Sequence, residues 1–150
     1  MIRGIRFEVP HKRFPVLYLM TKGINTNKYF WILVEEDVHR DWENYFDKDR
    51  YSGSEFEYVI KDENCYAVLL NLQAYTNEKD LTNIRSYYDF VNSKCELIIF
   101  INDNTRVDIY AKDLGLIEII KRNAEKNKFE DIKYITEEND RRTGPKGFSA

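Results

Sequence analysis

The sequence predicts an α+β fold: a single domain over residues 1–136, with one mixed β-sheet of about six to seven strands and about three helices packed mainly on one face. Three observations favour this class. The chain of 150 residues is 43% hydrophobic, which is enough for one sizeable core. Strand-like alternation and helix-like spacing follow one another along the chain. Finally, hairpins and crossovers both occur in the predicted order, β-α-β, hairpin, α, hairpin, α-β.

The first elements are defined by clear local patterns. Residues 2–9 alternate apolar and polar side chains, which predicts a strand with one solvent-exposed face that ends at Pro10. A short helix is predicted over residues 14–22, closed by Gly23. Residues 29–35 are apolar on both faces and therefore predict a central strand that is covered on both sides.

The middle of the chain is harder to assign. Residues 35–58 are polar and aromatic, and at most a short helix is predicted near residues 41–47. Residues 56–61 and 65–75 then predict the two strands of a hairpin.

Helices and strands alternate again in the second half. The pattern predicts a helix over 80–92, strands over 97–101 and 106–112, a helix over 114–127 and a last strand over 132–136. Residues 137–150 have no apolar period, so we expect a flexible C-terminal tail.

Charge and hydropathy argue against two classes of partner. The 23 basic and 26 acidic residues leave a net charge of −3, whereas a nucleic-acid module relies on basic surface to neutralise phosphates. The longest apolar runs, residues 29–34 and 97–101, are far shorter than the roughly 20 residues that cross a bilayer. No apolar signal segment follows the N-terminus. We therefore expect a soluble, cytoplasmic protein with no nucleic-acid and no membrane partner.

The residue types that carry most polar chemistry are scarce. There are two histidines and two cysteines, and the six glycines form no phosphate-binding loop. A catalytic thiol needs an activating histidine, and the sequence places none beside Cys65 or Cys95. Carboxylates surround His39, but without the spacing of a calcium loop or a zinc site. We expect no catalytic residue, no metal and no cofactor, and the sequence favours a non-enzymatic protein.

Residues 35–58 are the strongest local anomaly. They contain nine acidic and three basic residues, and therefore a net charge of −6, with aromatic residues interleaved. Aromatic side chains anchor interfaces and an acidic field steers a basic partner. We expect a surface that binds a basic protein partner, with Trp42, Tyr45 and Tyr51 as anchors and Glu43, Asp47 and Asp49 as steering charges. The alternative is a solvated loop whose aromatic residues fold back onto the core.

A second candidate site follows from strand alternation. Polar side chains share one face of each of two predicted strands, and if those faces are neighbours they form a polar floor for a small ligand. The residues of this alternative pocket are Asn71, Gln73, Tyr75, Asp108 and Tyr110. The competing interpretation is that these groups bond to neighbouring loops or face water. This pocket would suit a small-molecule-binding protein or a minor enzyme.

Basic residues gather on the last predicted helix, at Lys121, Arg122, Lys126 and Lys128. A solvated helix face explains them, but together with the acidic residues 35–58 they make the chain electrically asymmetric. Weak self-association through the opposite charges is a further possibility that the sequence leaves open.

Five segments resemble a known family. They are residues 3–10, 28–35, 71–75, 107–112 and 134–140, and together they extend over nearly the whole chain. They are similar to family 2691 of the domains of unknown function, small proteins from spore-forming Gram-positive bacteria. The resemblance implies a single-domain bacterial cytosolic protein. It implies no activity, ligand or site residue, because the family has no assigned function.

Overall fold

The computed structural model describes residues 1–61 and 64–148 and contains one eight-stranded sheet. Its path is β3-β2-β5-β6-β7-β1-β8, and β4 also pairs with β2. The strands are β1 (Ile2–Glu8), β2 (Phe30–Arg40), β3 (Glu43–Asn44), β4 (Arg50–Tyr51), β5 (Tyr66–Tyr75), β6 (Cys95–Asn102), β7 (Arg106–Ala111) and β8 (Glu130–Thr136). The helices are α1 (Val16–Thr21), α2 (Gly53–Ile60), α3 (Tyr87–Val91) and α4 (Leu114–Lys126), with 3₁₀ turns η1 (Thr26–Lys28) and η2 (Glu78–Asp80).

The α+β class is confirmed, but the sheet is not mixed. Every strand pairing among the described residues is antiparallel. The direction of a strand depends on which neighbour it meets, and alternation along one segment carries no information about that neighbour.

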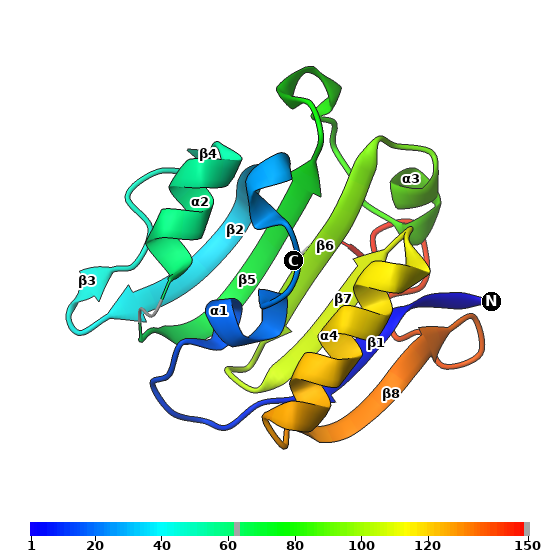
Figure 1. Cartoon of the computed structure of the whole chain (residues 1–150). Helices are drawn as coiled ribbons and strands as arrows, with labels where there is room; N and C mark the ends of the chain where they lie inside the picture. Colours follow the sequence, from blue (N-terminus) through cyan, green and yellow to red (C-terminus); the bar gives the residue numbers. More distant parts are fainter. Residues whose placement is uncertain (62–63, 149–150) are drawn as a thin grey trace.

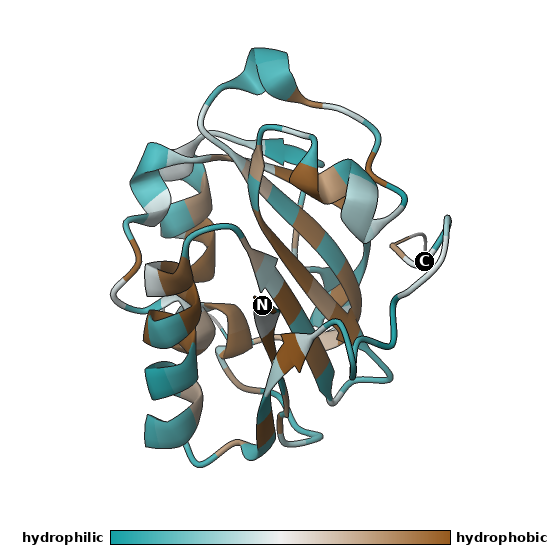
Figure 2. Ribbon diagram, turned by 90° about the vertical axis from the view of Figure 1, so that its right-hand side faces the viewer, coloured by the Kyte–Doolittle hydropathy of each residue, from teal (hydrophilic) through white to brown (hydrophobic). Residues whose placement is uncertain are grey.

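Helices cover the two faces of the sheet unequally (Figures 1 and 2). Helices α1, α2 and α4 lie on one face and enclose the larger core, which includes Trp31, Leu72 and Ile109. Helix α3 and the C-terminal segment, which we define as residues 137–148, lie on the other face over a smaller core. Strand β6 is central, because Ile98 faces the smaller core and Ile99 the larger one, each with no exposed surface.

The prediction of a strand over residues 56–61 is wrong, because residues 56–60 belong to helix α2 and Lys61 is its C-cap. Ser52 accepts a hydrogen bond from the Glu55 backbone N–H, and the Glu55 side chain accepts one from the Ser52 N–H. This capping box was visible in the sequence as Ser-x-x-Glu. Phe56 and Ile60, four residues apart, then face the core, and the Phe56 ring stacks on Trp31 with 4.2 Å between ring centroids.

We expect the substitution Ser52→Ala to lower the free energy of unfolding by about 1 kcal/mol, since α2 loses the acceptor at its N-cap. Urea unfolding followed by circular dichroism measures this loss. Ser52→Thr keeps the hydroxyl group and should stay within about 0.5 kcal/mol of the wild type. Equal stabilities for the two variants would contradict the capping role.

Two further helix predictions also differ from the structure. Residues 41–47 form a hairpin turn and strand β3 in place of a short helix. In the predicted helix 80–92 only α3 is α-helical, because Ser86 caps the helix at this later point by accepting from the Asp89 N–H. The other helices agree more closely, and α4 begins after Asp113, whose carboxylate accepts from the Gly115 N–H at 2.7 Å.

The C-terminal segment lies against the sheet, whereas the sequence predicted a flexible tail over residues 137–150. Phe148 is 1% exposed, and its ring centroid lies 4.6 Å from that of Tyr110. Its backbone N–H donates to the Arg85 carbonyl at 2.8 Å. Asp140 is also buried and accepts from the Tyr110 hydroxyl at 2.6 Å. This segment is held by a few specific contacts and has no periodic apolar face. Sequence periodicity therefore does not predict that it packs against the sheet.

No helix in the described part of the chain combines the length and the apolar character needed to cross a bilayer.

Candidate functional site

The hairpin between β2 and β3 presents the tryptophan that the sequence singled out. Arg40 pairs with Glu43, so the connecting loop consists of two residues, Asp41 and Trp42. Asp41 adopts a positive φ of 53°, a conformation that Asp tolerates in tight hairpin turns. Arg13 forms an ion pair with the Asp41 carboxylate at 2.5 Å and attaches the turn to the body of the protein. The Trp42 side chain is left almost completely in solvent, at 99% exposure.

A groove of about 610 Å³ lies beside this hairpin, between β3 and helix α2, and we call it the hairpin groove. Its wall includes Arg40, Glu43, Tyr45, Asp47, Tyr58 and Lys61. Tyr58, on the outer face of α2, is 84% exposed and adds a second accessible aromatic ring. Tyr58 is one of the aromatic residues interleaved with the acids of residues 35–58, but it was not among the expected anchors.

Two of the three expected anchors are buried. Tyr45 is 3% exposed, and its hydroxyl donates to the Val59 carbonyl at 2.8 Å. Tyr51 is 2% exposed and packs near Phe46, with 5.8 Å between ring centroids. The expectation that Tyr45 and Tyr51 contact a partner is therefore corrected, because both rings fold back onto the core. Of the three aromatic residues, Trp42 alone stays accessible.

Tyr51 has a structural role below the acidic loop. Its hydroxyl donates to the Asp47 carboxylate at 2.7 Å and accepts from the backbone N–H of Asp47 at 3.1 Å and of Lys48 at 3.3 Å. Burial, with a smaller contribution from the Asp47 hydrogen bond, raises the pKa of Tyr51 to about 12. The neutral phenol therefore fixes the loop at neutral pH.

The acidic residues that were expected to steer a partner lie at the surface. Glu43, Asp47 and Asp49 are all exposed, although Asp47 is held by Tyr51. The neighbouring Glu55 forms an ion pair with Lys48 at 2.5 Å. The hydrogen bond from Lys48, followed by smaller contributions from hydrogen bonds with Ser52, lowers the pKa of Glu55 to about 2. Glu55 therefore stays ionised at neutral pH and adds to the negative charge of residues 35–58.

The residues of the alternative pocket do lie on one face of the sheet, but protein atoms cover most of them. Asn71, Gln73, Tyr75 and Tyr110 are 5%, 2%, 0% and 0% exposed. Phe148 and α3 pack over this face as part of the smaller core.

Polar side chains on this face form hydrogen bonds with other groups of the protein. The Tyr75 hydroxyl donates to the Gln73 side chain at 2.8 Å, and Asp108 accepts from Arg142 at 3.0 Å. Burial raises the pKa of both Tyr75 and Tyr110. The arrangement agrees with the competing interpretation from the sequence, in which these groups bond to neighbouring segments.

The two cysteines are free thiols and both are buried. Burial raises the pKa of Cys95 to about 12, so its reactive thiolate form is suppressed. Within the described residues, no group of three or more His, Cys, Asp and Glu side chains is arranged to hold a metal ion.

Comparisons with known proteins agree on one relationship. A family model described as "Protein of unknown function (DUF2691)" matches residues 2–145. The chain is also 32% identical over 149 residues to the uncharacterized protein YncE of Bacillus subtilis (strain 168), a match that covers 95% of this chain and 97% of that protein. No solved structure matches the chain. The resemblance found in the sequence is thus confirmed.

Proposed function

The chain belongs to the DUF2691 family of proteins of unknown function, and we propose that it is a non-enzymatic binding protein that captures a basic protein partner at the Trp42 hairpin and the hairpin groove. The observation that carries this proposal is the position of Trp42, 99% exposed at the tip of a two-residue loop. Tryptophan in such a position leaves a large apolar surface in water, and tryptophan is enriched among the residues that dominate binding energy.

The surroundings of Trp42 specify the chemistry of the partner. Residues 35–58 carry a net charge of −6, and Glu43 and Asp49 are exposed on the same segment. Arg40 is a cation of this region, but it lies over the Tyr45 ring at 5.5 Å and donates to the Tyr45 carbonyl. A partner with lysine and arginine side chains around an apolar pocket complements this surface. The free thiols of Cys65 and Cys95 suit an encounter in the reducing cytoplasm.

The proposal is tested with the triple variant Trp42→Ala, Glu43→Lys, Asp49→Lys. These three side chains are exposed, so we expect the variant to fold with an unchanged circular dichroism spectrum. Truncating a hot-spot residue weakens binding by about 2 kcal/mol or more, which is roughly 30-fold. Affinity capture from a bacterial lysate identifies basic proteins retained by the wild type, and titration of the purified partner measures the loss.

The matched control is Tyr88→Ala, Glu130→Lys, Glu137→Lys, which removes one exposed aromatic ring and reverses two exposed carboxylates elsewhere. This control should bind like the wild type, and binding of the wild type should weaken as salt is added. Retention of the same partners by the Trp42 triple variant, or loss of acidic partners only, would refute the proposal.

A further inference from the structure

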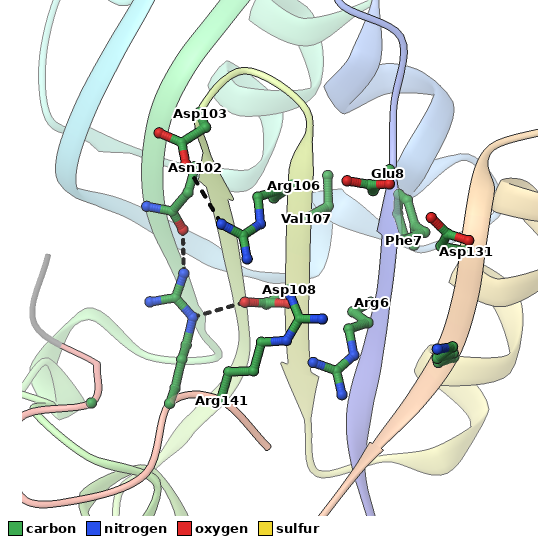
Figure 3. A pocket seen from close by; sticks show the side chains of 13 residues that line it. Arg6, Phe7, Glu8, Asn102, Asp103, Arg106, Val107, Asp108, Asp131 and Arg141 are labelled. Carbon is green, nitrogen blue, oxygen red and sulfur yellow. Dashed lines mark hydrogen bonds and ion pairs between the residues drawn. The ribbon is translucent and has the colours of Figure 1, made fainter. Parts of the chain in front are cut away.

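A second groove, of about 560 Å³, lies near the other end of the strand order from the Trp42 hairpin. We call it the basic groove. Strands β1, β7 and β8 and the C-terminal segment form its walls (Figure 3). Five cationic side chains line it: Arg6, Arg106, Lys133, Arg141 and Arg142. They come from four separate parts of the chain, so no sequence motif predicts that they lie together.

Two of these cations are neutralised by the protein itself. Arg142 donates from Nε to Asp108 at 3.0 Å, bonds to the Asn102 side chain, and lies 3.9 Å from the centroid of the Phe100 ring. Arg106 forms an ion pair with Asp103 at 3.6 Å. The other three, Arg6, Lys133 and Arg141, have no carboxylate partner among the described residues.

The register of the sheet brings like charges together. Arg6 on β1 stands directly opposite Lys133 on β8 and opposite Asp108 on β7. Like charges at directly opposed positions of neighbouring strands are destabilising. Asp108 does not relieve this repulsion by pairing with Arg6, because its carboxylate is bonded to Arg142.

Arg6 also has an unused hydrogen-bond donor. One terminal nitrogen donates to the Asn139 carbonyl at 2.6 Å, but Nε is buried and has no acceptor in the part of the chain that the structure describes. Figure 3 shows Arg6 and Arg141 pointing toward one another across β7 from opposite sides. An anion between these guanidinium groups would accept from Arg6 and neutralise the opposed charges.

We propose that the basic groove binds a small molecule that carries a phosphate group, with the phosphate held by Arg6, Lys133 and Arg141. The planar guanidinium groups match the oxygens of phosphate, and three cations offset a double negative charge. The volume of the groove exceeds that needed for inorganic phosphate alone and lies in the range of sites for organic ligands.

Carboxylates restrict the ligand to a compact anion. Asp103 lies at one side of the groove, and Glu8 and Asp131 lie beside β1 at another. A hydrogen bond with Asp131, followed by desolvation, raises the pKa of Glu8. These acids would repel the continuous phosphate chain of a nucleic acid, but they can accept hydrogen bonds from the hydroxyl groups of a phosphorylated sugar.

Isothermal titration calorimetry with inorganic phosphate and with ribose 5-phosphate tests the proposal. We expect both to bind, the ester more tightly, and both affinities to fall with added salt. Arg141→Gln should weaken binding of the ester at least about tenfold, the effect of losing one charge-assisted hydrogen bond. Arg141 is exposed and has no hydrogen bond or ion pair within the described residues, so this variant should fold normally.

Arg122→Gln is the matched control, since it removes the same charge from an exposed position on α4 and should leave binding unchanged. Arg6→Gln should weaken binding as Arg141→Gln does. The proposal is overturned by absence of binding at millimolar ligand, by wild-type affinity in both groove variants, or by tighter binding of a single-stranded oligonucleotide than of ribose 5-phosphate.

Discussion

Phe148→Ala should lower the free energy of unfolding by about 3 kcal/mol, because it removes a buried aromatic ring from the smaller core. The Phe148 ring is 1% exposed and lies within 5.2 Å of Phe100 and 4.6 Å of Tyr110, measured between ring centroids. Removing it leaves a cavity between α3 and the sheet and uncovers apolar surface of the smaller core. Urea unfolding followed by circular dichroism measures the loss.

Phe148→Leu is the matched control, because it retains an apolar side chain at the same position and should lose less than half as much stability. The C-terminal segment also carries Arg141 and Arg142, so Phe148→Ala should weaken phosphate binding in the basic groove. A loss of stability below about 1 kcal/mol would show that the segment does not pack as described.

Gly4→Ala should destabilise the protein by about 3 kcal/mol, at the upper end of the range for overpacking. A Cβ atom at residue 4 would lie 1.9 Å from the Ile109 carbonyl oxygen and 3.0 Å from the Tyr110 Cα. Both are backbone atoms of β7, so no side-chain rotation can relieve the clash. Strands β1 and β7, which pair from Gly4 to Glu8, would have to separate.

Gly115→Ala provides the comparison for Gly4→Ala. The closest atom to its new Cβ would be a carboxylate oxygen of the Asp113 side chain at 3.0 Å, which can move at the cost of weakening its hydrogen bond to the residue 115 N–H. The higher helix propensity of alanine offsets that loss, so we expect stability to change by no more than about 1 kcal/mol. Thermal unfolding separates the two variants, since 3 kcal/mol corresponds to roughly 10 °C in a chain of this size. Similar midpoints for both would refute the steric argument.

The two proposed sites lie toward opposite ends of the sheet and differ in charge. The hairpin groove adjoins β2 and β3, whereas the basic groove adjoins β1, β7 and β8. Binding of a protein partner at the first and of a phosphorylated molecule at the second are therefore separable by mutation. Trp42→Ala should leave phosphate binding intact, and Arg141→Gln should leave partner capture intact.

For residues 35–58, the sequence predicts an acidic surface with an exposed tryptophan, but it does not predict which of the other aromatic residues are buried. Trp42 and the exposed carboxylates were identified from composition alone, since charge and aromatic content are properties of the segment itself. Tyr45 and Tyr51 were assigned to the same surface, although they are buried. Composition cannot separate the rings that face the core from those that face water where no regular period exists.

The α+β class and the elements with strong local patterns can be predicted from the residues alone. Strands β1, β6, β7 and β8 and helix α4 follow from alternation, apolar runs and the cap at Asp113, because these signals lie within a few residues of each other.

The antiparallel strand order, the docking of Phe148 and the assembly of the basic groove depend on long-range packing. Arg6, Lys133 and Arg141 are distant in sequence, and their meeting depends on β1 lying between β7 and β8. Such contacts arise from the packing of whole elements against each other, which no local periodicity encodes.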